Sequence, residues 1–484
     1  MLLYELLEGI GEYRLFGVRG DTAISSPFTD TREAVAKGLF ICIEGTGLDG
    51  HIFAKSAAEM GASAVVANRP IEGVPTVVVS DTQFAAAVIW NNYYKRPSGN
   101  MRLFGITGTN GKTSTLSFLA FCLGCQGRKV GTIGTLGAFA LGERVDIKGS
   151  EKTGVCSAMT TPDPRYLYEA LSKFRDMGVE DVVMEVSSHG IAQRKVDPLN
   201  FYVGIFTNLT PEHLDYHKSM EEYFRVKASF VSRCQKRIVN ADDSDCRRFS
   251  ASVPSICVGR DMLSCVAADK SFVSYSFEYK GETVNIKSSV GGDFTVYNTL
   301  FASVAALEGG VSAKNVEKGI FSLKNVKGRM ESVDTGDAGF DVIIDYAHTP
   351  DALEKVLCHL RRYTVGRLIC VFGCGGERDR GKRPLMGRIA ESFCDGVIVT
   401  SDNPRGEDPL SIIKDITDGM KKDCFAVIPK RKEGIYAAIS MADEGDTVLL
   451  AGKGHETYEI GKAGFSDFDE REIVREAIAL RFGK

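Results

Sequence analysis

The chain has 484 residues, of which 44% are hydrophobic and 25% are charged, a composition typical of soluble globular proteins. This length is too great for one compact core, so we expect about three domains. The formal net charge of −4 argues against binding to nucleic acid, and no apolar stretch reaches the ~18 residues of a membrane span. The start lacks the basic segment of a signal peptide, and the thirteen cysteines form no disulfide framework, so we expect a cytoplasmic protein.

The first domain is expected over residues 1–98. Two short apolar runs, 62–67 and 76–79, read as buried strands between helical patterns. A turn-rich segment at 96–100 then separates this domain from the next. The alternation of strands and helices predicts an α/β domain.

The second domain, expected over residues 99–328, begins with the most informative feature of the chain. A predicted strand over 102–107 leads into a glycine-rich loop, and an apolar-periodic helix follows from residue 114. Backbone N–H groups of such a loop can bind phosphate oxygens, a lysine can reach the β/γ-phosphates and a threonine hydroxyl can bind Mg²⁺. The standard Gly-x4-Gly-Lys-Thr spacing is not met, because Ile106 stands where a glycine is required, which disfavours an ordinary NTPase. The loop consists of Gly108, Thr109, Asn110, Gly111, Lys112 and Thr113.

Further along, apolar runs at 181–186 and 203–207 alternate with helical patterns and predict a mostly parallel sheet. Glu185 closes the first of these strands, where a carboxylate could hold Mg²⁺ or cap the next helix. His213 and His217 would share one face of a helix, a spacing found in zinc sites and in structural histidine pairs alike. Lys227, on a predicted helix, reads by itself as a solvated cation.

The third domain, expected over residues 329–484, repeats the alternating pattern. Ligands of open α/β sheets collect at the carboxyl ends of the strands, so the polar residues there are candidate site residues. Asp402-Asn403-Pro404-Arg405 follows one such strand, although Asn-Pro is also an ordinary turn starter. The predicted strands are 342–345, 368–372, 396–400 and 447–451.

Eight motifs in order, covering nearly the whole chain, resemble those of the Mur ligases, which join a carboxylate to an amine using ATP. A folylpolyglutamate synthase would share the ATP loop but not this combination. The resemblance implies an N-terminal nucleotide-sugar domain, a central P-loop-type ATPase domain and a Rossmann-like C-terminal domain. Besides the ATP loop, the motifs are Thr160-Thr161-Pro162, Glu185 to Gly190, Asn208 to His217, Lys227, Gly328 to Glu331, Asp345 to Pro350 and Gly452 to Glu456.

The resemblance also implies the residues that bind ATP and two Mg²⁺ ions. The catalytic residues would be Lys112, Glu185, His213 and Lys227. Lys227 would help to bind metal as an N-carboxylated (carbamylated) lysine, beside the metal ligands Thr113, Glu185 and His213. ATP would be bound by residues 108–113 together with Asn298, Arg329 and Asp345. The stretch 297–302 is expected to begin a helix, so an N-cap is the alternative role for Asn298.

Two further groups of residues would bind the other substrates. The UDP-muramoyl-peptide would contact Thr31, Thr160, Thr161, Ser187, Gln193 and Lys195. Lys195 departs from the family pattern, because it stands where an arginine is expected and lacks the planar fork of a guanidinium. Arg405 could bind the second carboxylate of diaminopimelate, and lysine would leave a buried guanidinium there unpaired. The diaminopimelate site would comprise Arg378, Asp402, Asn403, Pro404, Arg405, Gly452 and Glu456.

The implied activity is ATP-dependent addition of meso-diaminopimelate to UDP-N-acetylmuramoyl-L-alanyl-D-glutamate through an acyl phosphate. This step would belong to peptidoglycan precursor synthesis and so to cell-wall biogenesis, cell shape and cell division, and we expect a monomer. The alternatives are a lysine-adding ligase, a folate-glutamate ligase, a nucleotide-dependent switch or motor, and a non-catalytic scaffold. No basic or coiled-coil segment supports the switch.

Overall fold

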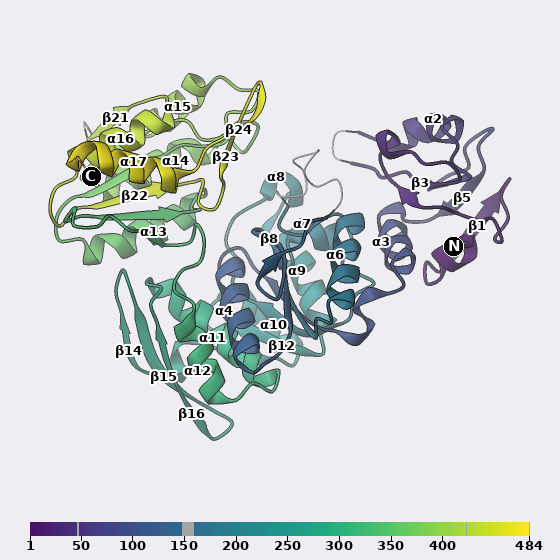
Figure 1. The fold of residues 1–484 in the computed structure, drawn as a ribbon, viewed down its shortest axis with the longest axis horizontal. Helices are drawn as coiled ribbons and strands as arrows, with labels where there is room; N and C mark the ends of the chain where they lie inside the picture. Colours follow the sequence, from purple (N-terminus) through teal and green to yellow (C-terminus); the bar gives the residue numbers. More distant parts are fainter. Residues whose placement is uncertain (46–47, 148–158, 423, 484) are drawn as a thin grey trace. The chain divides into compact units, whose positions relative to one another are not determined.

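The computed structural model describes residues 1–45, 48–147, 159–422 and 424–483 (Figure 1). The chain divides into two compact units. The first unit comprises Met1–Gly108, Gln126–Thr207 and Glu221–Cys257, and the second comprises Thr109–Cys125, Asn208–Met220 and Val258–Lys484. Within the described ranges, no helix is both long enough and apolar enough to cross a membrane.

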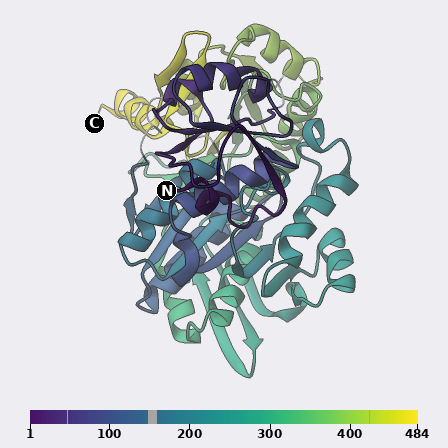
Figure 2. The same cartoon turned by 90° about the vertical axis from the view of Figure 1, so that its right-hand side faces the viewer.

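The N-terminal part of the first unit holds a five-stranded sheet of order β1-β5-β4-β3-β2, drawn in dark purple in Figure 2. All neighbouring pairs are parallel except β1 with β5. Apolar side chains of α1 and α3 pack on one face of the sheet, and those of α2 pack on the other. The elements are α1 (Leu3–Leu7), β1 (Tyr13–Phe16), β2 (Pro27–Phe28), β3 (Leu39–Ile41), α2 (Ala54–Glu59), β4 (Ala64–Ala67), β5 (Thr76–Val79) and α3 (Thr82–Tyr93).

An eight-stranded sheet of order β13-β12-β11-β6-β10-β7-β8-β9 follows along the chain. Its five neighbouring strands from β12 to β7 are parallel, and β8 and β9 add an antiparallel edge. The elements are β6 (Arg102–Thr107), β7 (Val130–Gly134), β8 (Gly137–Ala140), β9 (Glu143–Arg144), α6 (Pro164–Asp176), β10 (Asp181–Glu185), α7 (Ser188–Ala192), β11 (Phe201–Phe206), α9 (Met220–Ser232), β12 (Lys236–Asn240), α10 (Ser244–Ser252) and β13 (Ile256–Val258).

In the second unit, helix α4 (Lys112–Cys125) packs against α11 and α12. The approach of α12 is close, because a side chain at Gly319 would collide with the backbone of Cys122. A three-stranded antiparallel sheet packs on α11 and α12. The remaining elements of this region are α8 (Leu214–His217), β14 (Leu263–Ala268), β15 (Val273–Tyr279), β16 (Glu282–Ser288), α11 (Asp293–Glu308) and α12 (Ala313–Ser322).

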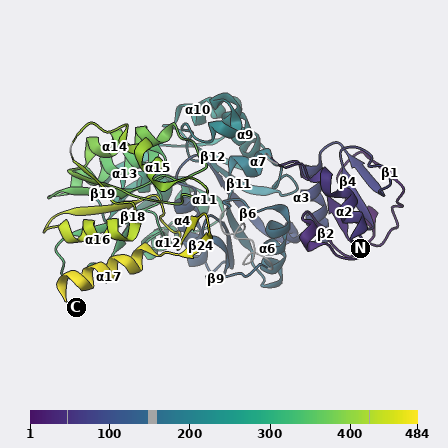
Figure 3. The same cartoon turned by 90° about the horizontal axis from the view of Figure 1, so that it is seen from above.

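The C-terminal part of the second unit is built on a six-stranded sheet of order β17-β18-β22-β19-β20-β21, parallel except for β17. Figure 3 shows α13, α14 and α15 on one face of this sheet and α16 and α17 on the other. The elements are β17 (Glu331–Val333), β18 (Asp341–Asp345), α13 (Pro350–Tyr363), β19 (Leu368–Phe372), α14 (Lys382–Phe393), β20 (Gly396–Val399), α15 (Pro409–Thr417), β21 (Phe425–Val427), α16 (Arg431–Met441), β22 (Thr447–Ala451), β23 (Tyr458–Gly461), β24 (Gly464–Asp467) and α17 (Glu470–Phe482).

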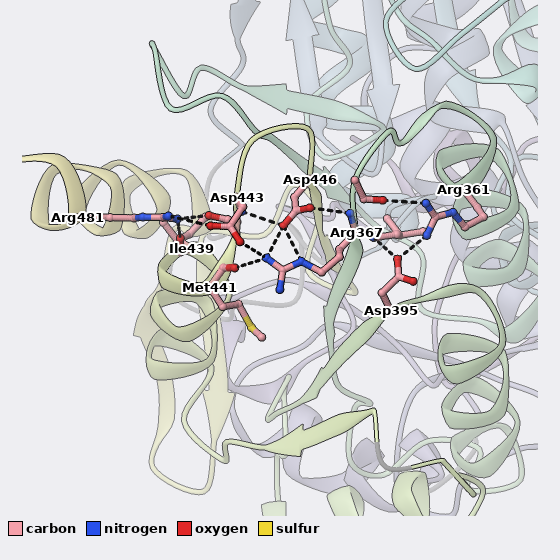
Figure 4. A network of polar contacts seen from close by, with 11 residues as sticks. Arg361, Arg367, Asp395, Ile439, Met441, Asp443, Asp446 and Arg481 are labelled. Atoms are coloured by element: carbon pink, nitrogen blue, oxygen red, sulfur yellow. Dashed lines mark hydrogen bonds and ion pairs between the residues drawn. The ribbon is translucent and has the colours of Figure 1, made fainter.

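The amino ends of these parallel strands are tied together by charged side chains (Figure 4). Arg367, just before β19, donates from its backbone N–H and its guanidinium to Asp446, just before β22, at 2.6 and 2.8 Å. Asp395, just before β20, accepts from the Leu368 N–H at 2.8 Å. The candidate site residues of this part of the chain must therefore be sought at the carboxyl ends of the same strands.

The predicted fold class is confirmed, because the chain is α/β and its large sheets are mostly parallel. Every strand predicted from an apolar run is present within two residues of its expected bounds. The domain boundaries at residues 98 and 328 stay a prediction.

Candidate active site

The glycine-rich loop joins β6 to α4, as its sequence predicts, although the helix begins at Lys112 rather than at residue 114. The Thr109 N–H donates to the Asn208 carbonyl at 3.0 Å, and the Asn110 N–H donates to Asn208 Oδ1 at 2.9 Å. Lys112 Nζ donates to the Thr109 carbonyl at 2.8 Å. The loop is therefore held in place at the N-terminus of a fourteen-residue helix, where N–H groups and the helix dipole favour an anion.

Gly111 is required by its conformation and by its neighbour. Its φ is +85°, and a Cβ there would lie 2.4 Å from Asn298 Oδ1. Asn298 is buried on α11 and its Oδ1 accepts from Thr115 at 3.5 Å. The structure thus brings the predicted adenine-side residue Asn298 to the phosphate loop.

The expectation that a helix begins at residue 297 is wrong. Helix α11 already begins at Asp293, after Gly291 and Gly292, and Thr295 in its first turn donates to the Gly291 carbonyl. Asn298 therefore lies in the second turn and is not an N-cap. The glycine pair was the sequence signal for the earlier start.

Three predicted motifs of the second unit meet at Arg329. Its Nη2 donates to the Thr113 hydroxyl at 3.3 Å, and its guanidinium lies 4.7 Å from the centre of the Tyr346 ring. Asp345 accepts from the Met330 N–H at 2.8 Å, and burial raises the pKa of this carboxyl. Gly454 packs closely against Tyr346, because a Cβ at this glycine would lie only 2.6 Å from the Tyr346 Cβ.

Asp351 joins the phosphate loop to α13. Sequence reasoning included it only as the last residue of the stretch from Asp345 to Asp351, which resembles an element that closes on phosphate and ribose, and gave it no role of its own. Its Oδ2 accepts from Asn110 Nδ2 at 2.8 Å and from the Thr210 hydroxyl at 3.3 Å. Lys355, one helical turn along, donates to the same oxygen at 2.8 Å. Asp351 does stand at the end of the predicted Asp345 to Pro350 motif, which was the available signal.

Glu185 ends β10 and is almost completely buried. Its two carboxylate oxygens accept from the Thr135 N–H at 2.9 Å and from the Thr135 hydroxyl at 3.1 Å. Ser187, not Glu185, caps the following helix by accepting from the Gly190 N–H. The capping alternative for Glu185 is therefore wrong, and Thr135 holds its carboxylate in one orientation.

Lys227 is not the solvated cation that its position in a helix suggested. Its side chain is buried on α9, where Nζ donates to the Gly108 carbonyl at 2.8 Å and lies 4.7 Å from the centre of the Tyr223 ring. Tyr223 and Lys227 are four residues apart and so share one helix face. Lys227 thus reaches the first residue of the phosphate loop.

The prediction that His213 and His217 share one helix face is wrong. Helix α8 begins at Leu214, and His213 precedes it in the left-handed conformation with φ +56°. The His213 side chain is 41% exposed, with Nε2 3.6 Å from Glu212 Oε2, whereas His217 is buried. The pair therefore lacks the geometry of a two-histidine zinc site, and His213 alone is accessible to a ligand.

The predicted metal ligands do not all belong to the same unit. Glu185 and Lys227 belong to the first, and Thr113 and His213 belong to the second.

The predicted UDP-muramoyl-peptide residues lie in the first unit, several of them around Glu185. The Thr161 hydroxyl donates to the Glu185 carbonyl at 3.1 Å and accepts from the Ser187 N–H at 2.8 Å, while Thr160 lies 3.2 Å from Thr135, hydroxyl to hydroxyl. Gln193 ends α7. Thr31 begins the short 3-10 helix Thr31–Glu33 in the N-terminal part.

Lys195 keeps the positive charge of the expected arginine in a buried position. Its Nζ lies 2.7 Å from Asp163 Oδ1. Arg194 does not replace the missing guanidinium, because it is bound to Asp81 at 3.0 Å and Asp197 at 2.7 Å. With lysine in place of the arginine that the family pattern predicts, this position therefore carries one compact ammonium.

The predicted diaminopimelate residues gather at the carboxyl ends of β20, β19 and β22. Asn403 donates to Glu456 Oε2 at 2.8 Å, and Gly452 (φ +115°) leaves space beside Asp402. Burial and the neighbouring Asp402 carboxylate raise the pKa of Glu456 to about 7. Arg378 is exposed in the loop after β19, and Pro404 is buried beside Asn403.

Arg405 is half-buried rather than buried, which modifies the expected basis of selectivity. Its Nη1 donates to the Gly376 carbonyl at 2.9 Å and to the Asn403 carbonyl at 3.3 Å. A lysine substrate would therefore not leave the whole guanidinium without partners. The remaining N–H groups are those that a substrate carboxylate could take.

Sequence reasoning did not identify three fully buried charged side chains near the predicted diaminopimelate residues: Arg431, Glu470 and Lys453. Arg431 is paired with Glu470 at 2.8 Å and donates to the Ala451 carbonyl at 2.8 Å. Lys453 is also fully buried. Lys453 stands inside the Gly452 to Glu456 motif, which was the only signal for it in the sequence.

Comparison with known proteins gives consistent matches. Residues 106–306 match the Mur ligase middle domain, and residues 328–454 match the glutamate ligase domain of Mur ligases. The chain is 40% identical over 464 residues to UDP-N-acetylmuramoyl-L-alanyl-D-glutamate--2,6-diaminopimelate ligase 1 of Clostridium acetobutylicum, covering 94% of each chain. It is 39% identical over 475 residues to the Bacillus cereus protein named as the same ligase, covering 95% of this chain and 94% of the relative.

Solved structures agree with these matches. A structure of UDP-N-acetylmuramoyl-L-alanyl-D-glutamate--2,6-diaminopimelate ligase matches with a TM-score of 0.68, 27% identity and 99% coverage of both chains. A MurF ligase from Thermotoga maritima in complex with ADP matches with a TM-score of 0.61 and 18% identity, over 94% of this chain and 97% of the other. The second likeness concerns the fold alone.

Proposed function

Because the chain belongs to the Mur ligase family, we propose that it is an ATP-dependent ligase that adds meso-diaminopimelate to UDP-N-acetylmuramoyl-L-alanyl-D-glutamate. The observation that carries this proposal is the loop after β20, which places Asp402, Asn403 and Arg405 beside Glu456. This group offers a guanidinium for a carboxylate and a carboxylate for an ammonium, and diaminopimelate carries both of these groups on the carbon at its far end.

ATP would bind at the phosphate loop. The N–H groups at the start of α4 and the Lys112 ammonium would hold the β/γ-phosphates, and Asn298 lies against Gly111 on the side expected for the adenine. The Arg329 guanidinium, which contacts Thr113, is placed to stabilise charge on the transferred phosphoryl group.

Two of the implied metal ligands, Thr113 and Glu185, have the oxygen donors that Mg²⁺ prefers. Thr113 offers a hydroxyl, and Glu185 offers a carboxylate that Thr135 holds in one orientation. His213 offers an imidazole, and Lys227 could contribute only after carboxylation of Nζ, because an ammonium binds no metal. Two bound Mg²⁺ ions would neutralise charge on the phosphates of ATP.

The reaction would proceed in two steps. The γ-carboxylate of the D-glutamate residue attacks the γ-phosphoryl group, which gives an acyl phosphate and ADP. The neutral amine of diaminopimelate then attacks the acyl carbon, and phosphate leaves as the amide forms. Lys112 and Arg329 act on the transferred phosphoryl group, while Arg405 and Glu456 orient the amino acid, so catalysis rests on positioning and electrostatics.

We place the reaction in the cytoplasm, because thirteen scattered cysteines without a disulfide framework suit a reducing compartment. Its product would enter peptidoglycan synthesis.

The test is phosphate release from ATP, Mg²⁺ and the UDP-dipeptide, with meso-diaminopimelate, L-lysine or no amine. Release that requires diaminopimelate is expected from the wild-type protein, and none is expected from a Lys112→Ala control, which loses the phosphate cation but no core side chain. Release with lysine alone would keep the ligase chemistry and overturn the substrate. Release without any amine would favour a nucleotide-driven switch.

A further inference from the structure

Lys453 is a fully buried cation that the mechanism above does not use. It follows β22, and its Nζ donates to Asn403 Oδ1 and to the Tyr458 carbonyl, both at 3.0 Å. The same nitrogen lies 3.5 Å from Asp402 Oδ1 and 4.0 Å from Glu456 Oε2. Burying an ammonium is costly unless its protons are bound, so these partners account for its presence.

We propose that Lys453 is a positioning residue for the amino-acid substrate: it fixes the Asn403 amide so that Asn403 holds Glu456 ready for the substrate ammonium. This inference rests on the proposed function. It concerns a residue that touches no substrate and acts through two others.

The orientation of the Asn403 amide follows from its partners. Its Oδ1 accepts from Lys453 Nζ and from the Ile460 N–H, each at 3.0 Å. Two donors on the oxygen leave the NH₂ group to face Glu456, whose Oε2 accepts from Nδ2 at 2.8 Å. One oxygen of Glu456 is thus bound by the protein, and the other remains for an ammonium.

Lys453 also ties this group to the hairpin of β23 and β24. It binds the carbonyl of Tyr458, the first residue of β23, and the Arg405 N–H donates to the Ile460 carbonyl at 2.9 Å. The ammonium also lies 5.3 Å from the centre of the Phe468 ring. One buried charge therefore connects the carboxyl end of β22, the loop after β20 and the hairpin.

The charges around Glu456 predict a change in the pH dependence of the reaction, which a residue important only for packing would not cause. Burial and the Asp402 carboxylate raise the pKa of Glu456, while the Asn403 hydrogen bond and the charges of Lys453 and Arg405 lower it. The phenols of Tyr346 and Tyr458 also face this carboxyl. Loss of the Lys453 charge should move the pKa of Glu456 further above about 7, so that the carboxylate form needed to bind an ammonium is reached only at higher pH.

The experiment compares wild type, Lys453→Met and Asn403→Asp, with Lys462→Met, an exposed lysine in the β23–β24 turn, as control. We expect Lys453→Met to raise the KM for diaminopimelate by about tenfold or more and to leave the KM for ATP within about twofold. The acid limb of kcat/KM for diaminopimelate should move to higher pH. The control should match wild type in all three quantities.

Asn403→Asp keeps the test decisive if Lys453→Met does not fold. It retains an acceptor for Lys453 but replaces the donor to Glu456 by a second carboxylate, so the acid limb should again move to higher pH. Wild-type product formation with an unmoved acid limb in the variants that fold would overturn this inference alone. Absence of product from the wild type would overturn the proposed function and this inference with it.

Discussion

At the scale of single residues, the role of a side chain depends more on the atoms that surround it in the fold than on the residues beside it in the sequence. Lys227 reads as a solvated lysine when it is taken without the family resemblance, and Lys453 was noted only as part of a motif. Both are buried with their ammonium groups bound to backbone carbonyls. Lys112 was recognised because glycines surround it. Membership of a motif pointed to Lys453 as well, but its partners Asn403 and Tyr458 became known only from the fold.

The first prediction at this scale concerns Arg405→Lys. Lysine keeps the charge but cannot form two parallel bonds to a carboxylate, so the KM for diaminopimelate should rise about 10- to 100-fold while the KM for ATP changes little. Steady-state kinetics with each substrate varied in turn measures both constants. Arg388→Lys, on the exposed side of α14, is the matched control. An unchanged KM for diaminopimelate would remove Arg405 from the substrate site.

At the scale of elements, apolar runs located the strands correctly because parallel strands covered on both faces are continuously hydrophobic. The first residues of helices were predicted less accurately than the strands. The start of α11 was placed four residues late because Gly291 and Gly292 were not read as the end of the preceding segment, and α8 proved too short to carry His213. Asn110 and Asp351 both stand at predicted motifs, but nothing in the sequence near either residue indicated that the two would pair.

The two ends of the parallel strands in the C-terminal sheet have different roles. The carboxyl ends carry Asp402 and Lys453, and the amino ends carry the ion network of Figure 4. Within this network, burial alone would raise the pKa of Asp446, but the N–H groups of Asp443 and Arg367 and the Arg367 guanidinium hold it below its ordinary value. The network therefore stabilises the fold without touching the site.

The prediction at this scale is that Asp446→Asn lowers the free energy of unfolding by about 1–3 kcal/mol at neutral pH, because buried donors lose their charged acceptor. The lowered pKa fixes the sign: this stabilisation is full above the unfolded-state pKa and is lost as pH falls through the lower folded-state pKa. The difference between variant and wild type should therefore shrink in acid. Denaturant titrations at several pH values measure it.

Asp443→Asn provides the control for that experiment. The Asp443 side chain is 74% exposed although it lies 2.8 Å from Arg367 Nη2. An exposed ion pair contributes about 0–1 kcal/mol, so this variant should remain close to wild type. Equal destabilisation by both substitutions at neutral pH would contradict the assigned role of the buried carboxylate.

At the scale of the whole molecule, the order of motifs along the chain gave the family before any geometry was known, and the matches over 94% of the chain bear it out. The chemical class followed from the phosphate loop and the choice of amino acid from the loop after β20. The supporting residues Thr135, Asp351 and Lys453 did not follow, because each acts across a sheet or between segments far apart in sequence.

The most direct test of the account is a competition assay. Wild-type protein is given ATP, Mg²⁺, the UDP-dipeptide and equal concentrations of meso-diaminopimelate and L-lysine, and the products are resolved by mass. We predict that the diaminopimelate product exceeds the lysine product by at least about 100-fold, because only diaminopimelate has the second carboxylate that Arg405 would bind. Comparable amounts of the two products, or ATP consumption without either, would contradict it.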